Sequence, residues 1–144
     1  MTTDLNIINL RAAAEALMAH GVDVHGADAR GLPLHSNGHL GVDLLQVPPN
    51  TSFPIHVHPG DHLLLCLAGE GTISVGERTY EVRPGDIYMV DGDTPHAVGA
   101  GEAGHTLLAI GAPHKPVESP DRMNFTDWSG TVTDAPLFVE HGHG

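Results

Sequence analysis

The stretch Phe53-Pro54-Ile55-His56-Val57-His58-Pro59-Gly60-Asp61-His62 decides how the rest of the sequence is interpreted. Successive side chains of an extended strand point to opposite faces, so His56 and His58 share one face and Val57 lies on the other. The pair Pro59-Gly60 is a turn signal, and a turn there brings His62 back toward the same point. We therefore expect three imidazoles to converge.

A fourth histidine joins this set from a distant part of the chain. His96 stands in Asp93-Thr94-Pro95-His96, after several segments with strand and turn signals. A lone His-x-His pair is more often a surface pair or a hydrogen-bonded pair in the core, but two further histidines favour a metal. Imidazole is the commonest metal-ligating side chain and suits zinc, iron, copper and nickel. The prediction is one divalent metal ion bound by His56, His58, His62 and His96.

The spacing of these histidines resembles the two motifs of the cupin superfamily. The first motif runs Gly-x5-His-x-His-x3,4-Glu-x6-Gly, and the second runs Gly-x5-Pro-x-Gly-x2-His-x3-Asn. Here His56, His58, Gly69, Gly85 and His96 match. The sequence departs from the motifs at five positions: Asn50 replaces Gly, His62 replaces Glu, Asp91 replaces Pro, Asp93 replaces Gly and Ala100 replaces Asn.

The resemblance covers about residues 40–110 and implies an all-β double-stranded β-helix of the jelly-roll type around a metal. In many cupin dioxygenases and decarboxylases, the Glu that His62 replaces ligates the metal or takes a proton from the substrate. Four neutral imidazoles leave the metal's charge uncompensated, which makes it a strong Lewis acid. We expect zinc, with iron, manganese or nickel as alternatives, in an open site with positions free for water or a chelating substrate.

The rest of the chain reads as scaffold within a single domain, residues 1–144. We expect a helix at about residues 9–20, ended by Gly21, and irregular structure or short edge strands over 21–38. Pro113, Pro116 and Pro120 predict an extended tail along the surface over 111–144, in which 134–141 could add an edge strand. Strands, with a two-residue hairpin at 76–77, are expected at 40–47, 53–58, 62–68, 71–75, 78–82, 86–90, 96–100 and 105–110.

Composition disfavours two classes of partner. The 144 residues carry 18 acidic and 6 basic side chains, for a net charge of -12 with histidines neutral. Such a charge disfavours nucleic acid and anionic membrane surfaces. Cys66 is the only cysteine, so no internal disulfide forms, and the N-terminus lacks a signal pattern, which together predict a cytoplasmic protein.

Strand alternation predicts what surrounds the metal. If His62 and His96 face inward, so do Leu64, Cys66 and Val98, which gives a mostly apolar pocket suited to a hydrophobic substrate that carries oxygen atoms. Cys66 is more often a small core residue than a nucleophile. The weak candidates for acid-base catalysis, each of which has a structural role as the alternative, are Tyr88, His105 and Asp43.

Three functions remain open on the sequence. Four-histidine cupins of this length resemble the cupin-type polyketide cyclases of the resistomycin kind, which implies metal-assisted aldol-type ring closure of a poly-β-ketone in antibiotic biosynthesis. The same residues would serve a quercetinase-like dioxygenase, and a non-enzymatic small-molecule-binding cupin is the third reading. Cupins commonly pair through edge strands, so we expect a homodimer.

Overall fold

The computed structural model describes residues 5–139. This part of the chain contains one helix, α1 (Leu10–His20), and one 3-10 turn, η1 (Pro120–Arg122). The strands are β1 (Val22–Asp23), β2 (Arg30–Ser36), β3 (Gly41–Val47), β4 (His56–Val57), β5 (Asp61–Val75), β6 (Arg78–Val82), β7 (Ile87–Val90), β8 (Ala97–Ala112) and β9 (Asn124–Phe125).

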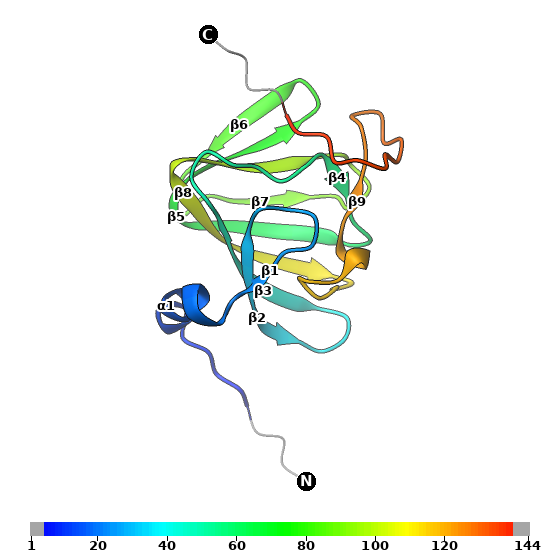
Figure 1. Ribbon diagram of the computed structural model, residues 1–144. Coiled ribbons are helices and arrows are strands. Elements are labelled where there is room, and N and C mark those ends of the chain that lie inside the picture. The colour runs from blue at the N-terminus through cyan, green and yellow to red at the C-terminus, as the bar shows by residue number, and fades with distance from the viewer. Residues whose placement is uncertain (1–4, 140–144) are drawn as a thin grey trace.

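Antiparallel pairing joins most strands into one curved sheet (Figure 1). Its order is β1-β2-β3-β8-β5-β6, and β7 pairs with the first residues of β5. The short strands β4 and β9 form a separate antiparallel pair. The predicted all-β class with one short N-terminal helix is therefore confirmed, and of the two alternatives expected over residues 21–38 the structure has the strands, β1 and β2, at one side of the sheet.

The two longest strands form the centre of the sheet, and each replaces two predicted strands. β5 runs through Gly69, and β8 runs through Gly104, where the sequence predicted breaks. The register of β5 against β8 shifts between Cys66 and Ala68 and again between Gly69 and Gly71. Gly69 has a φ of +76°, and a Cβ there would lie 2.1 Å from the carbonyl oxygen of Gly104. The predicted break is thus a bend, after which β5 pairs with β6 instead of β7.

The hairpin predicted at residues 76–77 is confirmed. Val75 pairs with Arg78, which leaves Gly76 and Glu77 as a two-residue connection. Gly76 has a φ of +62°, a conformation that glycine adopts without steric cost. Turn chemistry therefore fixes the register of β6 as the sequence predicted.

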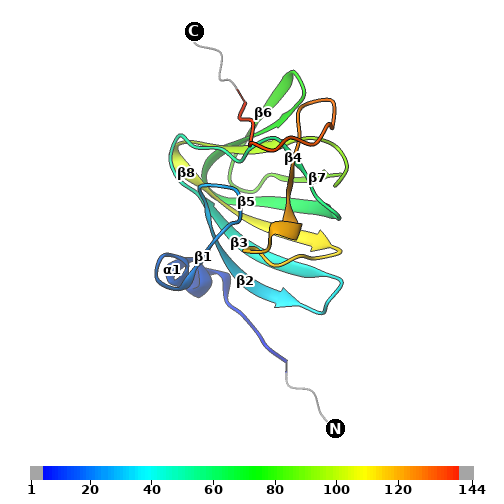
Figure 2. The ribbon, with the colours of Figure 1, turned by 45° about the vertical axis from the view of Figure 1, so that its right-hand side comes forward.

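The helix α1 lies close to its predicted bounds. The side chain of Asn9 accepts hydrogen bonds from the backbone N–H groups of Arg11 and Ala12, which caps the helix at its first turn. Leu17, buried with Ala13, packs against Leu44 of β3 in a cluster separate from the main core. The helix thus covers the outer face of the sheet (Figure 2).

The segment after β8 does not form the extended surface tail that its prolines predicted. Val117, Met123 and Thr126 are buried, and β9 pairs with β4. Figures 1 and 2 show this segment, in orange, running along the side of the barrel where β4 lies. The edge strand predicted at 134–141 is absent over residues 134–139, where Leu137 only accepts one backbone hydrogen bond from Ile55, and residues 140–141 lie outside the described part.

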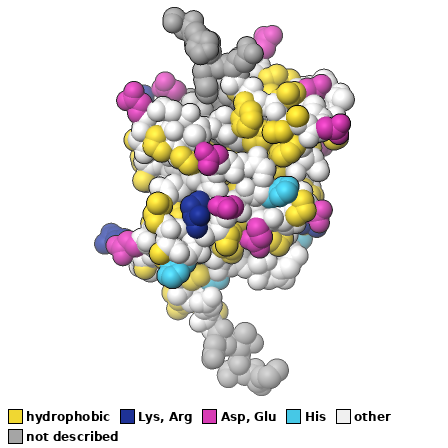
Figure 3. Space-filling view, in the orientation of Figure 1, with side chains coloured by type: hydrophobic (Ala, Val, Ile, Leu, Met, Phe, Trp, Pro, Cys, Tyr) yellow, Lys and Arg dark blue, Asp and Glu magenta, His cyan; other side chains and the backbone are white. Residues whose placement is uncertain are grey.

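Acidic side chains are scattered over the face of the molecule that Figure 3 shows, with few basic side chains between them. No helix among residues 5–139 has the length and apolar character needed to cross a membrane.

Candidate metal centre

Three of the four predicted ligands meet inside the barrel. His56 belongs to β4, His58 follows it, and His96 stands directly before β8. Paired backbone hydrogen bonds between His56 and His96, 3.0 and 3.1 Å long, place the two segments side by side. One ring nitrogen from each of the three lies within 4.8 Å of the others, and all three residues are buried. We call them the histidine group.

Backbone carbonyl groups set the tautomer of each ring in the histidine group. Nδ1 of His56 donates to the carbonyl oxygen of Pro54 (2.7 Å), and Nδ1 of His96 donates to that of Thr94 (2.7 Å). Nδ1 of His58 donates in the same way to Gly60. Because a carbonyl oxygen only accepts, each proton sits on Nδ1 and the lone pair of each Nε2 is free.

These lone pairs face one another. Nε2 of His58 lies 3.0 Å from Nε2 of His96. Two nitrogens without protons repel at that distance unless a cation binds both of them. A neutral imidazole whose second nitrogen donates to a carbonyl group is the usual form of a histidine that ligates a metal. The donor set therefore fits a divalent transition metal.

Electrostatics keep the group neutral near pH 7. Burial lowers the pKa of His96 to about 4, assisted by the neighbouring His58. Burial also lowers the pKa values of His56 and His58, and His96 lowers that of His56 further. Neutral imidazole is the form that binds metals, so no proton has to leave the site before an ion binds.

His62, the fourth predicted ligand, lies beside the group. Its ring stacks on that of His58 with centroids 3.8 Å apart and an angle of 16° between the planes. Burial and the nearby His58 lower the pKa of His62 to about 2. Its nitrogens are outside the set that converges within 4.8 Å, so its role as a ligand stays a prediction.

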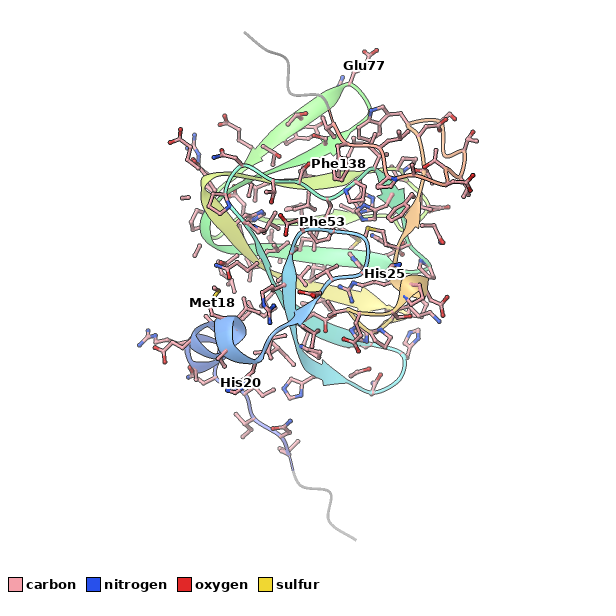
Figure 4. All side chains as sticks on the ribbon, in the orientation of Figure 1. Met18, His20, His25, Phe53, Glu77 and Phe138 are labelled. Atoms are coloured by element: carbon pink, nitrogen blue, oxygen red, sulfur yellow. The ribbon has the colours of Figure 1, made fainter. Side chains whose placement is uncertain are left out.

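A cavity of about 30 Å³ adjoins the histidines. That volume holds about one water-sized group. The predicted apolar walls are present, with Leu64 and Val98 in them, whereas Cys66 is buried in the surrounding core. Phe53, labelled in Figure 4, also lines the cavity. The complete lining is Val24, Leu45, Phe53, His56, His58, His62, Leu64, His96, Val98, Leu107, Arg122 and Met123.

Two segments outside the predicted core close this cavity. One is the covering loop, residues 24–29 between β1 and β2, which supplies Val24. The other is the covering segment, residues 113–126, which supplies Arg122 and Met123. They touch each other, because the N–H of His25 donates to the carbonyl oxygen of Val117 and a Cβ at Gly26 would lie 2.7 Å from the Phe125 ring. Figure 1 shows the covering loop, in blue, in front of the barrel.

Arg122 is the site residue that sequence reasoning missed. Its side chain is only 8% exposed, and its guanidinium group is the only formal cation among the lining side chains. Nη1 donates to Oδ2 of Asp43 (2.7 Å) and to the carbonyl oxygen of Lys115 (2.8 Å). No local pattern marks it, since it follows three prolines in a segment that reads as a tail.

The three weak candidates for acid-base catalysis lie outside the cavity lining. Oδ2 of Asp43 accepts hydrogen bonds from Arg122 and from Nε2 of His114 (2.8 Å), so its contact with the site passes through Arg122. Burial raises the pKa of Tyr88, and Nδ1 of His105 donates to the carbonyl oxygen of Gly99 (3.2 Å). These positions support structural roles, and direct catalysis by any of the three stays untested.

Comparisons with known proteins bear on the fold of the chain. Residues 43–110 match the family model described as the cupin domain. A polyketide cyclase, RemF from Streptomyces resistomycificus, has a similar structure, with a TM-score of 0.58 and 25% identity over 69% of this chain and 80% of that one. KdgF from Halomonas sp. has a TM-score of 0.59 and 14% identity over 66% of this chain and 88% of that one. The predicted cupin jelly roll is thereby confirmed.

The curated relatives match over a shorter stretch. The L-ectoine synthase of Vibrio cholerae is 32% identical over 66 residues, which are 44% of this chain and 48% of that protein. The L-ectoine synthase of Vibrio campbellii is 41% identical over 44 residues, 28% of this chain and 34% of that protein. The chain thus spans at most about half the length of the curated relatives it matches.

Proposed function

We propose that this cupin domain is the core of a metal-dependent enzyme in which His56, His58, His62 and His96 hold one divalent ion, with zinc favoured. The activity we propose is that of a polyketide cyclase, the aldol-type ring closure of a poly-β-ketone. The observation that carries the metal site is the free Nε2 lone pair on each of three buried imidazoles. His62 reaches the same centre if its ring turns away from its stack on His58.

The similarity to RemF supports the choice of reaction. That protein is a polyketide cyclase, and it matches this chain at 25% identity with a TM-score of 0.58. The L-ectoine synthases, which match part of the chain, are also enzymes by name. Apolar walls beside the histidines suit a substrate made mostly of carbon, as the cyclase reading requires.

The described residues contribute positioning and shielding to such a reaction. A bound divalent ion supplies Lewis acidity toward a carbonyl oxygen of the substrate. Leu64, Val98 and Phe53 exclude water around that oxygen, which strengthens polar interactions inside the cavity. Holding the two reacting carbons together lowers the barrier by several kcal/mol. A substrate with several carbonyl groups exceeds 30 Å³, so the covering loop and covering segment have to shift when it enters.

A dioxygenase is the second candidate, and the small cavity is the observation that favours it. A volume of about 30 Å³ suits a diatomic molecule beside an ion. Iron or manganese would then replace zinc. A non-enzymatic binding role is the third candidate and predicts ligand binding without turnover.

The experiment that separates these functions starts from metal-free protein. Zinc is added under strictly anaerobic conditions, and cyclisation of a poly-β-ketone is followed by mass spectrometry. We expect turnover with zinc, and none with the His56→Ala/His58→Ala variant. The control is His39→Ala, which alters an exposed histidine that is not part of the cavity lining. Turnover only with iron or manganese, with stoichiometric consumption of dioxygen, would establish the dioxygenase instead.

We also propose that the protein forms a homodimer. Ile87 and Met89 of β7 are 61% and 67% exposed, and Tyr80 on the neighbouring strand β6 is 49% exposed. Exposed apolar side chains close together favour an interface. Light scattering after gel filtration tests this proposal, and Met89→Glu should shift the mass toward that of a monomer.

A further inference from the structure

Arg122 is a costly residue to place inside this barrel. The chain has only 6 basic side chains, and this one is 8% exposed beside four imidazoles. Burying a guanidinium group costs several kcal/mol unless it is paired and hydrogen-bonded. It lines the same cavity as His58 and His62. The buried positive charge of Arg122, beside a site for a metal cation, needs an anionic group close to it.

Asp43 satisfies only part of the guanidinium group. Both hydrogen bonds of the Arg122 side chain use Nη1, one to Asp43 and one to the carbonyl oxygen of Lys115. Nε and Nη2 make no hydrogen bond with the described residues. Oδ2 of Asp43 is shared, since it also accepts from His114. The pair therefore fixes the position of the guanidinium group and leaves two of its nitrogens free to donate.

The cavity offers no other negative group. Its lining residues include neither Asp nor Glu. Four neutral histidines, a divalent ion and an arginine whose charge Asp43 balances leave the centre with a net charge of about +2. A ligand with an anionic group offsets that charge, and a carboxylate matches the fork of N–H donors on a guanidinium group.

We propose that Arg122 is a substrate-binding residue that holds a carboxylate group of the substrate in the histidine cavity. The inference rests on the proposed function, and it narrows the substrate to a keto acid rather than a neutral polyketone. A keto oxygen lies toward the histidines and the carboxylate lies on Arg122. Because Arg122 belongs to the covering segment, this contact also holds that segment over the bound substrate.

The test compares two ligands of similar shape. Acetoacetate carries a carboxylate, and acetylacetone replaces its charged oxygen with a methyl group. Calorimetric titration into zinc-loaded protein should show that Arg122→Gln weakens acetoacetate about 10-fold or more and leaves acetylacetone within about 2-fold. Arg122→Lys, which keeps the charge and loses the fork, should give an intermediate loss for acetoacetate. The matched control is Arg83→Gln, an exposed arginine that should change neither affinity.

Two further measurements separate this inference from a folding defect and from the metal site. Asp43→Asn/Arg122→Gln removes both charges together, and its thermal melt and zinc content show whether the fold and the metal site survive. The titrations are repeated on metal-free protein, where acetoacetate binding that depends on Arg122 would support the inference even if the metal proposal failed. Acetoacetate binding that is unchanged in a folded Arg122→Gln variant, or absent in the wild type, overturns the inference. An equal loss for both ligands also overturns it and assigns Arg122 to an enolate oxygen.

Discussion

The histidine group and Arg122 line the same cavity, but the chain holds them in different ways. Nδ1 of each histidine in the group donates to a carbonyl oxygen only two residues away along the chain. Arg122 depends on Asp43, which is 79 residues away, and on the turn η1. The first arrangement is local to β4 and the start of β8, whereas the second exists only when the covering segment packs on β3.

The histidine group and Arg122 therefore depend on different contacts in the fold. The side-chain hydrogen bonds that set the tautomers of the histidines need nothing from residues 113–126, although β4 itself pairs with β9 at the end of that segment. Arg122 takes its place in the cavity only when the covering segment packs on β3. Changes at the histidines should therefore act mainly on metal content, and changes at Arg122 or in η1 should act mainly on ligand binding and stability.

The largest expected effect is on metal content. His56→Ala/His58→Ala should remove more than about nine-tenths of the bound metal, because the loss of two imidazoles destroys the site. Elemental analysis of the purified protein measures this. His39→Ala is the matched control, and full metal occupancy in the double variant would refute the assignment.

His62→Ala measures whether the stacked ring is a ligand. A ligand's removal should lower metal affinity by about 10-fold or more, which is the size of loss seen when groups around a metal are changed. A competition assay with a zinc chelator gives the affinity. An affinity equal to that of the wild type would restrict the site to the histidine group.

The next largest effect concerns the contact between Arg122 of the covering segment and Asp43 of β3. Arg122→Ala should lower the free energy of unfolding by about 3–5 kcal/mol, because it leaves the buried carboxylate of Asp43 without its cationic partner. Asp43→Asn/Arg122→Gln should cost less than the two single changes added together. Urea denaturation measures Arg122→Ala, the double variant and the two single variants Asp43→Asn and Arg122→Gln. Arg83→Ala, which breaks an exposed pair of 3.8 Å with Glu81, should cost under about 1 kcal/mol.

Much of the histidine site could be predicted from sequence because the hydrogen bonds of each histidine are local, whereas the place of His96 beside the others was predicted from the resemblance to the cupin motifs. His-x-His on a strand fixes two side chains on one face, and the supporting carbonyl groups of Pro54, Gly60 and Thr94 lie within the same short motifs. The hairpin at Gly76 and the helix after Asn9 followed from local signals in the same way. Each of these elements is determined by residues close together in the chain.

The covering segment could not be predicted because its structure depends on distant contacts. Three prolines suggested an extended tail, yet Val117 and Met123 fill the core and Arg122 pairs with Asp43. The continuous strands β5 and β8 were missed for a related reason, since Gly69 and Gly104 resemble turn residues and their close approach exists only in the folded sheet. A glycine in the sequence indicates a bend within a strand as readily as it indicates the end of a strand.

Part of the pH dependence of stability should come from the buried histidines of the cavity. The folded pKa of His96 is about 4 and that of His62 is about 2, both below the unfolded value of about 6.5. The unfolded chain therefore binds more protons below pH 6.5, so the free energy of unfolding falls as the pH drops toward 4. Each such histidine contributes up to about 1.4 kcal/mol per pH unit.

Urea denaturation of metal-free protein between pH 7 and pH 5 measures this slope. His96→Gln should reduce it, because the variant lacks one of the imidazoles that only the unfolded chain protonates in this range. In metal-loaded protein the same acidification should release the ion, because protons compete for Nε2. Metal occupancy that stays constant down to pH 4 would contradict a shell made of histidines.

The smallest effect should come from Ser119, which caps the turn that carries Arg122. Its side-chain oxygen accepts a hydrogen bond of 3.1 Å from the N–H of Asp121. Ser119→Ala should lower the free energy of unfolding by about 0.5–1 kcal/mol, the usual cost of a lost cap at an exposed turn. Because the cap lies in the covering segment, metal content should stay at the wild-type level while acetoacetate affinity falls about 2-fold.

The matched control for that variant is Ser129→Ala, which removes a hydroxyl group that also bonds within its own turn, to Asp127 at 2.6 Å, but outside the cavity lining. It should cost a similar amount of stability and leave acetoacetate affinity unchanged, since its turn does not carry Arg122. A loss of affinity in Ser119→Ala alone would show that the position of Arg122 depends on its own turn. Equal affinities in the two variants would mean that Asp43 holds Arg122 in place without help from the cap.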